Sequence, residues 1–195
     1  MITLNNITLI CIDDNTFRGI NSINKSIKQV NFGAVKLLTG NYKGCQQQNI
    51  CISNLDAPLG SKENYSKFVL RELNNYVDTP FVLITQWDGF VINGDGWKDE
   101  FFDYDYIGAR WVWDNVVGNG GFSLRSKKFL EVCSTFSFEL THPEDHQICR
   151  IYKEDLEKLG LKFATSEVAH KFAVENETYT NQFGYHGGSR PRRLK

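Results

Sequence analysis

Residues 81–89 read FVLITQWDG, and this stretch decides the fold. Its first five residues are all apolar or β-branched, which is typical of a strand that is buried on both faces. Thr79-Pro80 ends any helix before it, and Gly89 permits a turn after it. Strands of this kind occupy the middle of a parallel sheet, so the preceding sequence should alternate between strands and helices.

The sequence upstream of this strand has that alternation. Residues 7–12 form a short apolar run that predicts a buried strand, and Asp13-Asp14 follows it. Apolar residues then recur at three- and four-residue spacing, which predicts a helix with one apolar face. The members of that face are Phe17, Ile20, Ile23, Ile27 and Val30.

Two further strands are expected at residues 34–38 and 50–52, and a second helix begins after Ser61, a residue type common at N-caps. The resulting β-α-β-β-α-β order predicts an α/β fold in which a mainly parallel central sheet is flanked by helices. Ligands of such sheets bind at the carboxyl ends of the strands, where the acidic loops 13–14 and 86–89 should lie.

The second half of the chain is less regular. A strand is expected at 106–109, a glycine-rich turn at 118–121 leads into another strand, and a short helix follows at 126–132. The last helix is predicted from Pro143 to Gly160, because proline favours the first helical position and glycine ends helices. Its inward residues should be Ile148, Ile151, Tyr152, Leu156 and Leu159.

The composition fits one compact domain. The chain has 195 residues, and 22 Lys and Arg against 23 Asp and Glu leave a net charge of −1, which gives no general attraction for nucleic acid. No run of 18 apolar residues occurs, so no membrane span is expected. The five cysteines form no CxxC pair, and Cys11 and Cys51 lie in apolar runs where burial is expected. This cysteine usage predicts a reducing, cytoplasmic location.

Asp88 comes directly after the central strand, so its carboxylate should be held at the edge of the sheet. Carboxylate oxygens suit Mg²⁺ or Mn²⁺, which commonly bridge one or two carboxylates and substrate phosphates. The alternative is that Asp88-Gly89 is only the turn of a β-hairpin between residues 81–85 and 90–92.

Three later segments could also carry chemistry. The glycines at 118–121 would allow close backbone approach to a ligand, or they form a plain turn. Residues 142–146, HPEDH, place two acids in the first turn of a helix, where they complement the helix dipole or accept a hydroxyl proton. His186 lies in a glycine-flanked aromatic segment and either faces a ligand or metal or serves packing.

Four motifs occur in a fixed order along the chain. They are QWDGFVIN (86–93), GNGGFSLRS (118–126), PEDHQIC (143–149) and FGYHG (183–187). This ordered set resembles the GT-A glycosyltransferases and, more closely, an uncharacterised bacterial and fungal domain family assigned to that fold. With the alternating pattern upstream, the resemblance covers nearly the whole chain.

The resemblance implies roles for residues that would bind the donor. Gln86 and Asp88 take the places of the two acids in a D-x-D motif, so Asp88 would ligate Mn²⁺ or Mg²⁺ bound to a nucleotide diphosphate. Gln86 replaces the first acid and leaves one carboxylate. Gly120 and Gly121 would match the glycine turn beside the donor sugar. His186 would match a late metal-ligating histidine.

The resemblance also implies an acceptor site and a nucleoside site. Glu144 and Asp145 would match the acidic pair that binds the acceptor, with Asp145 as the base and Glu144 as the acceptor ligand. Asp13 and Asp56 lie in loops that would touch the nucleoside. Trp87, Trp111, Trp113 and Tyr185 could stack on sugars, although packing in the core explains each of them equally well.

The function implied by the resemblance is transfer of a sugar, with inversion, from a nucleotide-sugar to a hydroxyl of a surface glycan or glycolipid. A catalytically inactive nucleotide- or carbohydrate-binding module is the alternative, and Gln86 is the feature that motivates it. A nucleotidyltransferase is disfavoured because no glycine-rich basic loop follows the first strand.

One domain is expected over residues 1–188, followed by a basic tail at 189–195. Basic residues near an anionic membrane surface contribute about 1 kcal/mol each, so the tail predicts weak, salt-sensitive contact with such a surface. Solvation of the chain end or contact with a partner subunit would account for the tail as well.

Overall fold

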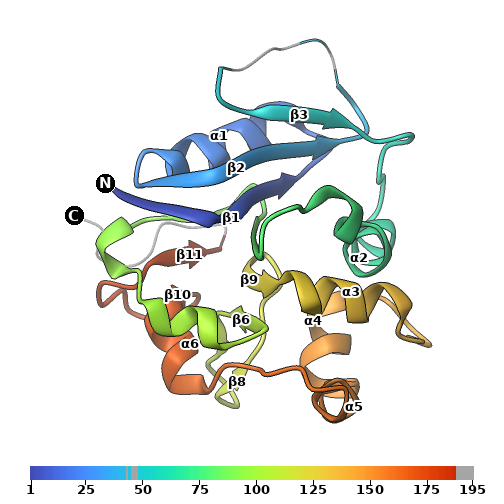
Figure 1. Ribbon diagram of the computed structural model, residues 1–195, viewed down its shortest axis with the longest axis vertical. Helices are drawn as coiled ribbons and strands as arrows, with labels where there is room; N and C mark the ends of the chain where they lie inside the picture. The colour runs from blue at the N-terminus through green and yellow to red at the C-terminus, as the bar shows by residue number, and fades with distance from the viewer. Residues whose placement is uncertain (43, 45–47, 188–195) are drawn as a thin grey trace.

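The structure is a computed structural model that describes residues 1–42, 44 and 48–187 (Figure 1). A six-stranded sheet forms its centre, with the strand order β3-β2-β1-β4-β9-β6. The strands are β1 (Ile2–Ile12), β2 (Val30–Thr39), β3 (Cys51–Asn54), β4 (Phe81–Thr85), β6 (Tyr106–Gly108) and β9 (Phe122–Ser126). The first four run parallel, whereas β9 is antiparallel to both neighbours. The expected α/β fold with a mainly parallel central sheet is confirmed.

Helices cover the sheet. They are α1 (Thr16–Ile27), α2 (Lys62–Arg71), α3 (Lys127–Thr135), α4 (Glu144–His146), α5 (Lys153–Lys158) and α6 (Ser166–Phe172), with 3₁₀ turns at Leu73–Tyr76, Gly94–Gly96 and Asp99–Asp103. α1 joins β1 to β2, and α2 lies in the connection that returns from β3 to β4, beyond β1 (Figure 1). Crossovers between parallel strands are right-handed. Because the step from β1 to β2 and the step from β3 to β4 move across the sheet in opposite directions, α1 and α2 lie on opposite faces of the sheet.

Two small sheets lie beside the central one. The first contains β10 (Ala173–Val174), β11 (Gly184–His186) and β5 (Gly89–Val91), and the second is the hairpin of β7 (Arg110–Trp111) and β8 (Val116–Val117). β5 follows β4 in sequence but pairs antiparallel with β11. The hairpin alternative for Asp88-Gly89 is therefore wrong, because the chain leaves the central sheet after β4.

The strand at 81–85 is observed at the predicted residues because its side chains from Val82 to Thr85 are all buried and Phe81 is partly buried. Leu83 is fully buried, as are Leu9 of β1 and Leu124 of β9 on either side of it. Burying a side chain of this size contributes about 1.5–3 kcal/mol. The α2 N-cap is also as expected, since Ser61 Oγ accepts a hydrogen bond from Asn64 N at 3.2 Å.

Several details of the helices differ from expectation. Phe17 is 82% exposed, because the buried face of α1 is formed by Gly19, Ser22, Ile23 and Ser26 and does not include it. Val30 belongs to β2. The helix predicted from Pro143 is divided into α4, a π-helical turn at Gln147–Ile151 and α5. The extra residue per turn rotates the apolar stripe, which leaves Ile151 and Leu159 exposed.

The cysteines of the described residues are free thiols. Cys11 is buried as expected, whereas Cys51 is exposed because it lies on β3, the edge strand of the sheet. Cys45 and the tail at 189–195 lie outside the described residues. Within the described part of the chain, none of the helices has the length and apolar character needed to cross a bilayer.

Candidate functional site

A cleft of about 610 Å³ opens at the carboxyl ends of β1 and β4. Six of the residues expected at the site line it, namely Asp13, Gln86, Gly121, Glu144, Asp145 and His186. Asp88 and Gly120 contact members of this group, as described below, without lining the cleft themselves. Asp56 is exposed and is not among the lining residues. The fold thus gathers residues that are up to 173 positions apart, from Asp13 to His186.

Strand pairing brings His186 to Asp88. β5 begins at Gly89, and the antiparallel pairing with β11 sets His186 opposite Gly89, one residue from Asp88. His186 Nε2 lies 3.4 Å from Asp88 Oδ1 and 3.4 Å from Gln86 Oε1. The other ring nitrogen, Nδ1, lies 3.0 Å from Glu175 Oε1 and 2.9 Å from Asn119 Nδ2.

The acidic neighbours control the charge of this histidine. Burial of the His186 ring lowers its pKa, but the carboxylates of Asp88 and Glu175 outweigh burial and raise the pKa to about 9. Burial raises the pKa of Asp88, and the contact with His186 more than offsets this, so the pKa of Asp88 is lowered. Without a bound cation, the ion pair neutralises both groups.

Asp88, His186 and Gln86 fit a divalent ion in part. Asp88 Oδ1 is buried and makes no hydrogen bond, and its contact is the ion pair with His186 Nε2, so a cation that displaced the histidine proton would find this oxygen as a ligand. His186 Nε2 and Gln86 Oε1 face the same place. The described residues contain no group of three or more His, Cys, Asp or Glu that could hold a metal. An ion here would therefore take its remaining ligands from a bound diphosphate and water.

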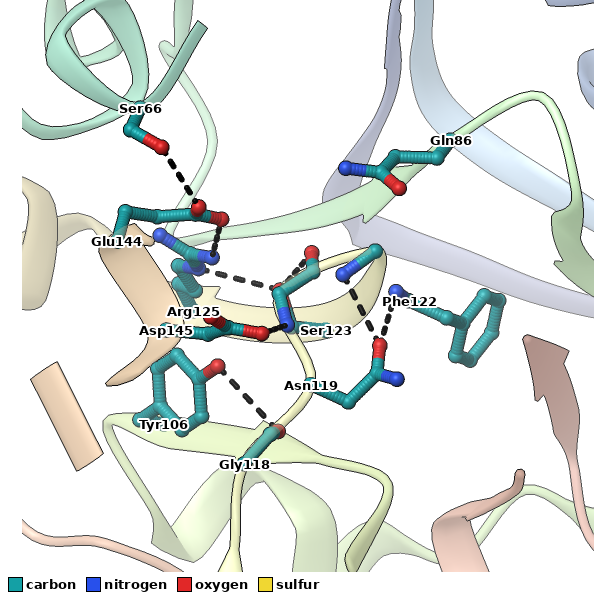
Figure 2. Close-up of polar contacts among 12 residues, drawn as sticks. Ser66, Gln86, Tyr106, Gly118, Asn119, Phe122, Ser123, Arg125, Glu144 and Asp145 are labelled. Carbon is teal, nitrogen blue, oxygen red and sulfur yellow. Dashed lines mark hydrogen bonds and ion pairs between the residues drawn. The ribbon is translucent and has the colours of Figure 1, made fainter. Parts of the chain in front are cut away.

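The turn before β9 requires its glycines. A Cβ at Gly121 would lie 2.1 Å from His186 Nε2, and one at Gly120 would lie 2.2 Å from Glu144 Oε1. Asn119 adopts a positive φ of 54°, and its Oδ1 accepts hydrogen bonds from the backbone N–H groups of Gly121 and Phe122 (Figure 2). The turn is thus packed directly between the histidine and the acidic pair.

The two acids of the PED motif have different surroundings (Figure 2). Glu144 is buried, its Oε1 lies 3.5 Å from Arg125 Nη2, and its Oε2 accepts a hydrogen bond from Ser66 Oγ at 3.2 Å. Asp145 is only partly buried, and its two oxygens accept hydrogen bonds from the backbone N–H groups of Gly120 and His146. Asp145 is therefore held in a fixed position at the cleft, whereas Glu144 is bound to Arg125 and Ser66.

Arg125 ties the acids to the glycine turn. Its side chain is 1% exposed, its Nε donates to Ser123 Oγ at 3.1 Å, and Ser123 Oγ in turn donates to the Gly120 carbonyl (Figure 2). Burial raises the pKa of Glu144 above its usual value, and the positive charge of Arg125 limits that rise without cancelling it. A fully buried guanidinium stays charged and needs a counter-charge, and the Glu144 carboxylate, 3.5 Å away, is placed to supply it.

The walls of the cleft near β1 are held by aspartates. Asp14 accepts backbone hydrogen bonds from Gly40 and Gly60, which fixes two loops. Asp13 Oδ1 accepts from Asn15 N at 2.7 Å and contacts Arg18, whereas its Oδ2 is buried without a hydrogen bond. That unpartnered oxygen is available to a ligand.

The aromatic residues divide between the cleft and the rest of the molecule. Trp87 lines the cleft, is 44% exposed and has the Arg18 guanidinium 5.2 Å from its ring centroid. Trp111 and Tyr185 are buried. Trp113 is exposed but does not line the cleft. Of the four, Trp87 is the ring placed to stack on a ligand.

Several residues of the cleft are not indicated by the sequence motifs. They are Arg18, Lys62, Tyr65, Ser66 and His142, which line it, and Glu175, which contacts His186. Asn119, which lines the cleft, and Arg125, which contacts Glu144, lie in the GNGGFSLRS motif, but the motif assigns them no role. The N-cap at Ser61 predicts where α2 begins, but it does not predict that the first turns of this helix line the cleft. Arg125 had a signal, because a charged residue in the apolar strand at 122–126 is unusual unless it has a buried partner.

Solved structures with similar folds include three glycosyltransferases. Mannosyltransferase PcManGT from Pyrobaculum calidifontis, in complex with GDP-Man and Mn²⁺, has a TM-score of 0.56 at 10% identity, over 82% of this chain and 54% of that one. Galactosyltransferase LgtC with donor and acceptor sugar analogues has a TM-score of 0.51 at 12% identity, over 94% and 87%. A glycosyltransferase involved in glycosylation of the major capsid of PBCV-1 has a TM-score of 0.50 at 10% identity, over 94% of both chains.

These similarities establish the fold, which is that of the GT-A glycosyltransferases as the sequence motifs imply. The chain spans about half the length of PcManGT. Among curated proteins, none matches the sequence. The family described as "Protein of unknown function (DUF5672)" matches residues 49–186, which is more than half of the chain, and the chain belongs to that family.

Proposed function

We propose that the protein transfers a sugar from a nucleoside-diphosphate sugar to a hydroxyl acceptor. The observation that carries this proposal is the convergence of three kinds of group on one cleft. Gln86, Asp88 and His186 form a cation-binding edge, Gly120-Gly121 forms a close-approach turn, and Glu144-Asp145 supplies carboxylates. The neighbours with GDP-Man or sugar analogues bound support a donor of this class.

The donor half of the cleft would hold the nucleotide. Asp88 and His186, with Gln86 Oε1, would hold Mn²⁺ or Mg²⁺ together with the diphosphate oxygens. Such an ion would offset the negative charge that grows on the leaving diphosphate. Asp13, through its unpartnered Oδ2, and Trp87, through its exposed ring, would contact the nucleoside or sugar. The glycine turn would let the donor sugar lie against the backbone.

The acceptor half would supply the base. Asp145 is the less buried of the two acids and is oriented by two backbone N–H groups, so it would accept the proton of the acceptor hydroxyl. Glu144 would support the acceptor side from its buried position. Attack by an activated hydroxyl opposite the leaving diphosphate would invert the anomeric carbon. NMR of the product linkage tests this, and retained configuration would remove Asp145 from the role of base.

Binding is tested by thermal shift with a panel of UDP- and GDP-sugars, with and without Mn²⁺. A ligand present at a hundredfold its Kd stabilises a protein by about 2.7 kcal/mol, which is a measurable rise in Tm. One nucleotide-sugar should raise Tm more than its free sugar does, and more with Mn²⁺ than without. A panel in which no nucleotide-sugar shifts Tm would contradict the proposal.

A binding module without turnover is the second candidate, and the replacement of an acid by Gln86 favours it. The two are separated by incubating the bound nucleotide-sugar with the protein and measuring release of nucleoside diphosphate. An enzyme releases it by slow hydrolysis or by transfer, whereas a module leaves the donor intact.

We further propose that the acceptor is a surface glycan or glycolipid and that the basic tail at 189–195 attaches the protein weakly to an anionic membrane. Co-sedimentation with anionic liposomes at low and high salt tests the attachment, and the chain ending at Gly188 is the control. Equal pelleting of both chains would leave the tail with a role in solvation or in contact with a partner subunit.

A further inference from the structure

A line of three polar side chains leads from the buried acid to the cleft. Ser66 Oγ on α2 lies 3.2 Å from Glu144 Oε2 and 2.9 Å from His142 Nδ1. Ser66 is 1% exposed and Glu144 is 5% exposed, whereas His142 is partly exposed. All three line the cleft. None of the four sequence motifs includes Ser66 or His142.

The direction of the hydrogen bonds in this line follows from their chemistry. A carboxylate accepts hydrogen bonds and cannot donate one, and the buried charge of Arg125, 3.5 Å from Glu144, favours the carboxylate form. Ser66 has one hydroxyl proton, which it therefore donates to Glu144 Oε2. The Ser66 oxygen is left as an acceptor, so His142 Nδ1 must carry a proton and donate to it.

This direction fixes the tautomer of the imidazole. With the proton on Nδ1, the neutral ring has a lone pair on Nε2, and Nε2 has no hydrogen-bond partner among the described residues. We propose that His142 Nε2 is a binding site for a sugar hydroxyl in the cleft, held as a hydrogen-bond acceptor by Ser66 and Glu144. Glu144 thereby reaches the sugar indirectly, through two side chains.

The identity of the ligand rests on the proposed function, since it is that function which puts sugars in the cleft. The acceptor sugar is the nearer source, because His142 is two positions before Glu144 in the sequence and Asp145 is the proposed base. A hydroxyl of the donor sugar has the same chemistry, and the experiment separates the two. Fixing the tautomer gives specificity, because a group without a proton to donate would leave Nε2 unpaired.

The tautomer is measured first, by ¹⁵N NMR of the ¹⁵N-histidine-labelled full chain at pH 8.5, where an ordinary imidazole is neutral. The ¹⁵N shifts of His142 should show the proton on Nδ1. In Ser66→Ala the ring should move to a mixture with the proton on Nε2, whereas Ser134→Ala, which removes a hydroxyl bonded only to the Glu131 carbonyl, should change nothing. A wild-type ring with its proton on Nε2 would overturn the inference, whatever Ser66→Ala does to stability.

Binding is measured next with His142→Asn. The Asn amide can still donate to Ser66 from the position of Nδ1, but the variant lacks Nε2. Affinity is compared for UDP and GDP, for UDP- and GDP-sugars, and for a panel of methyl glycosides added to the nucleotide complex. Loss of one hydrogen bond should weaken sugar binding by about tenfold. Weaker methyl glycoside binding identifies the acceptor, and weaker nucleotide-sugar binding with unchanged nucleotide binding identifies the donor.

Unchanged affinity for every sugar that binds the wild type would overturn the assignment of Nε2. If no sugar or nucleotide-sugar binds the wild type, the proposed function fails and the sugar assignment fails with it, whereas the tautomer result stands. The two failures are therefore distinguishable.

Discussion

At the scale of single residues, the cleft contains two charged pairs of different character. His186, which lines the cleft, and Asp88, which contacts it, are each 15% exposed, whereas Arg125 and Glu144 are covered almost completely. Because His186 lines the cleft, an incoming cation or phosphate can separate it from Asp88. A covered pair cannot change partners without leaving a buried charge alone, so its role is to hold the acids and the glycine turn in place.

The role of Asp88 is tested by Asp88→Asn. The amide keeps the shape of the side chain but loses the charge that a divalent ion requires, so Mn²⁺-dependent nucleotide binding should weaken by about tenfold or more. Calorimetric titration with and without Mn²⁺ measures this. Asp103→Asn, at an exposed position away from the cleft, is the matched control. Equal affinity of wild type and Asp88→Asn in Mn²⁺ would exclude Asp88 as a ligand.

The close approach of the glycine turn is tested by Gly121→Ala. Its methyl would lie 2.1 Å from His186 Nε2, so the ring must move, and overpacking of this kind costs about 1–3 kcal/mol. If His186 is the obstacle, the same substitution should cost much less in a His186→Ala background. Urea unfolding of the wild type, Gly121→Ala, His186→Ala and the double variant measures the difference between the two costs. Additive costs would show that Gly121 is required for some other reason.

At the scale of elements, short strands and turns complete the site that the central sheet begins. β5 and β11 have three residues each, and their pairing sets His186 beside Asp88. Glu177 links the hairpin β7–β8 to α6. Its carboxylate accepts two hydrogen bonds from Arg110 of β7 and lies 3.2 Å from His170 Nδ1 on α6. Gly118, where the motif turn begins, follows this hairpin directly.

The Glu177 link should make stability depend on acid pH. Burial raises the pKa of Glu177, but the hydrogen bonds and charge of Arg110 outweigh burial and lower the pKa below its usual 4.5. The contribution to stability is therefore complete above pH 4.5 and is lost as the pH falls through the lowered value. Glu177→Gln should unfold more easily at pH 7, by about 2 kcal/mol, and change less between pH 7 and pH 3.

Urea unfolding at the two pH values measures this difference, with Glu131→Gln on the exposed surface of α3 as the control. If Glu177→Gln and the wild type lose the same stability between pH 7 and pH 3, the carboxylate of Glu177 is not responsible for the loss of stability at acid pH.

The sequence predicts those elements whose side chains are buried on both faces or whose ends are marked by caps. β4 is found at its predicted residues, and α2 begins after its predicted N-cap. Gly160 has the positive φ of 83° expected after a helix. α6 was not predicted, because a helix of seven residues is too short to show a clear apolar repeat in the sequence. The π-helical turn was not predicted either, since it is stabilised by packing rather than by local sequence.

The site is predictable where the motif residues are contiguous with a strand or a helix start. Gln86, Gly121 and the acid pair follow from their motifs. The contact of His186 with Asp88 depends on the pairing of two three-residue strands, which carries almost no sequence signal. Ser66 and His142 come together across 76 positions because α2 packs beside α4, and neither has a neighbour in sequence that indicates this.

At the scale of the whole molecule, one sheet edge supplies both halves of the cleft. The parallel strands β1 and β4 end at the donor side, and the antiparallel strand β9 begins there, so its glycine turn reaches the same edge from the opposite direction. The acids of α4 then close the acceptor side through their contact with that turn. The arrangement places donor groups and acceptor groups within one cleft of about 610 Å³.

The central claim, sugar transfer from a nucleotide-sugar at this cleft, is tested most directly by product formation. The nucleotide-sugar that binds is incubated with an acceptor panel, and mass spectrometry follows the new glycoside together with release of nucleoside diphosphate. The wild type should form both, with at least one nucleoside diphosphate released for each glycoside formed. Asp145→Asn should bind the nucleotide-sugar with the same affinity but react at least about a hundredfold more slowly, because the base is lost. Binding without any glycoside or diphosphate release, or equal rates for the wild type and Asp145→Asn, would contradict the account.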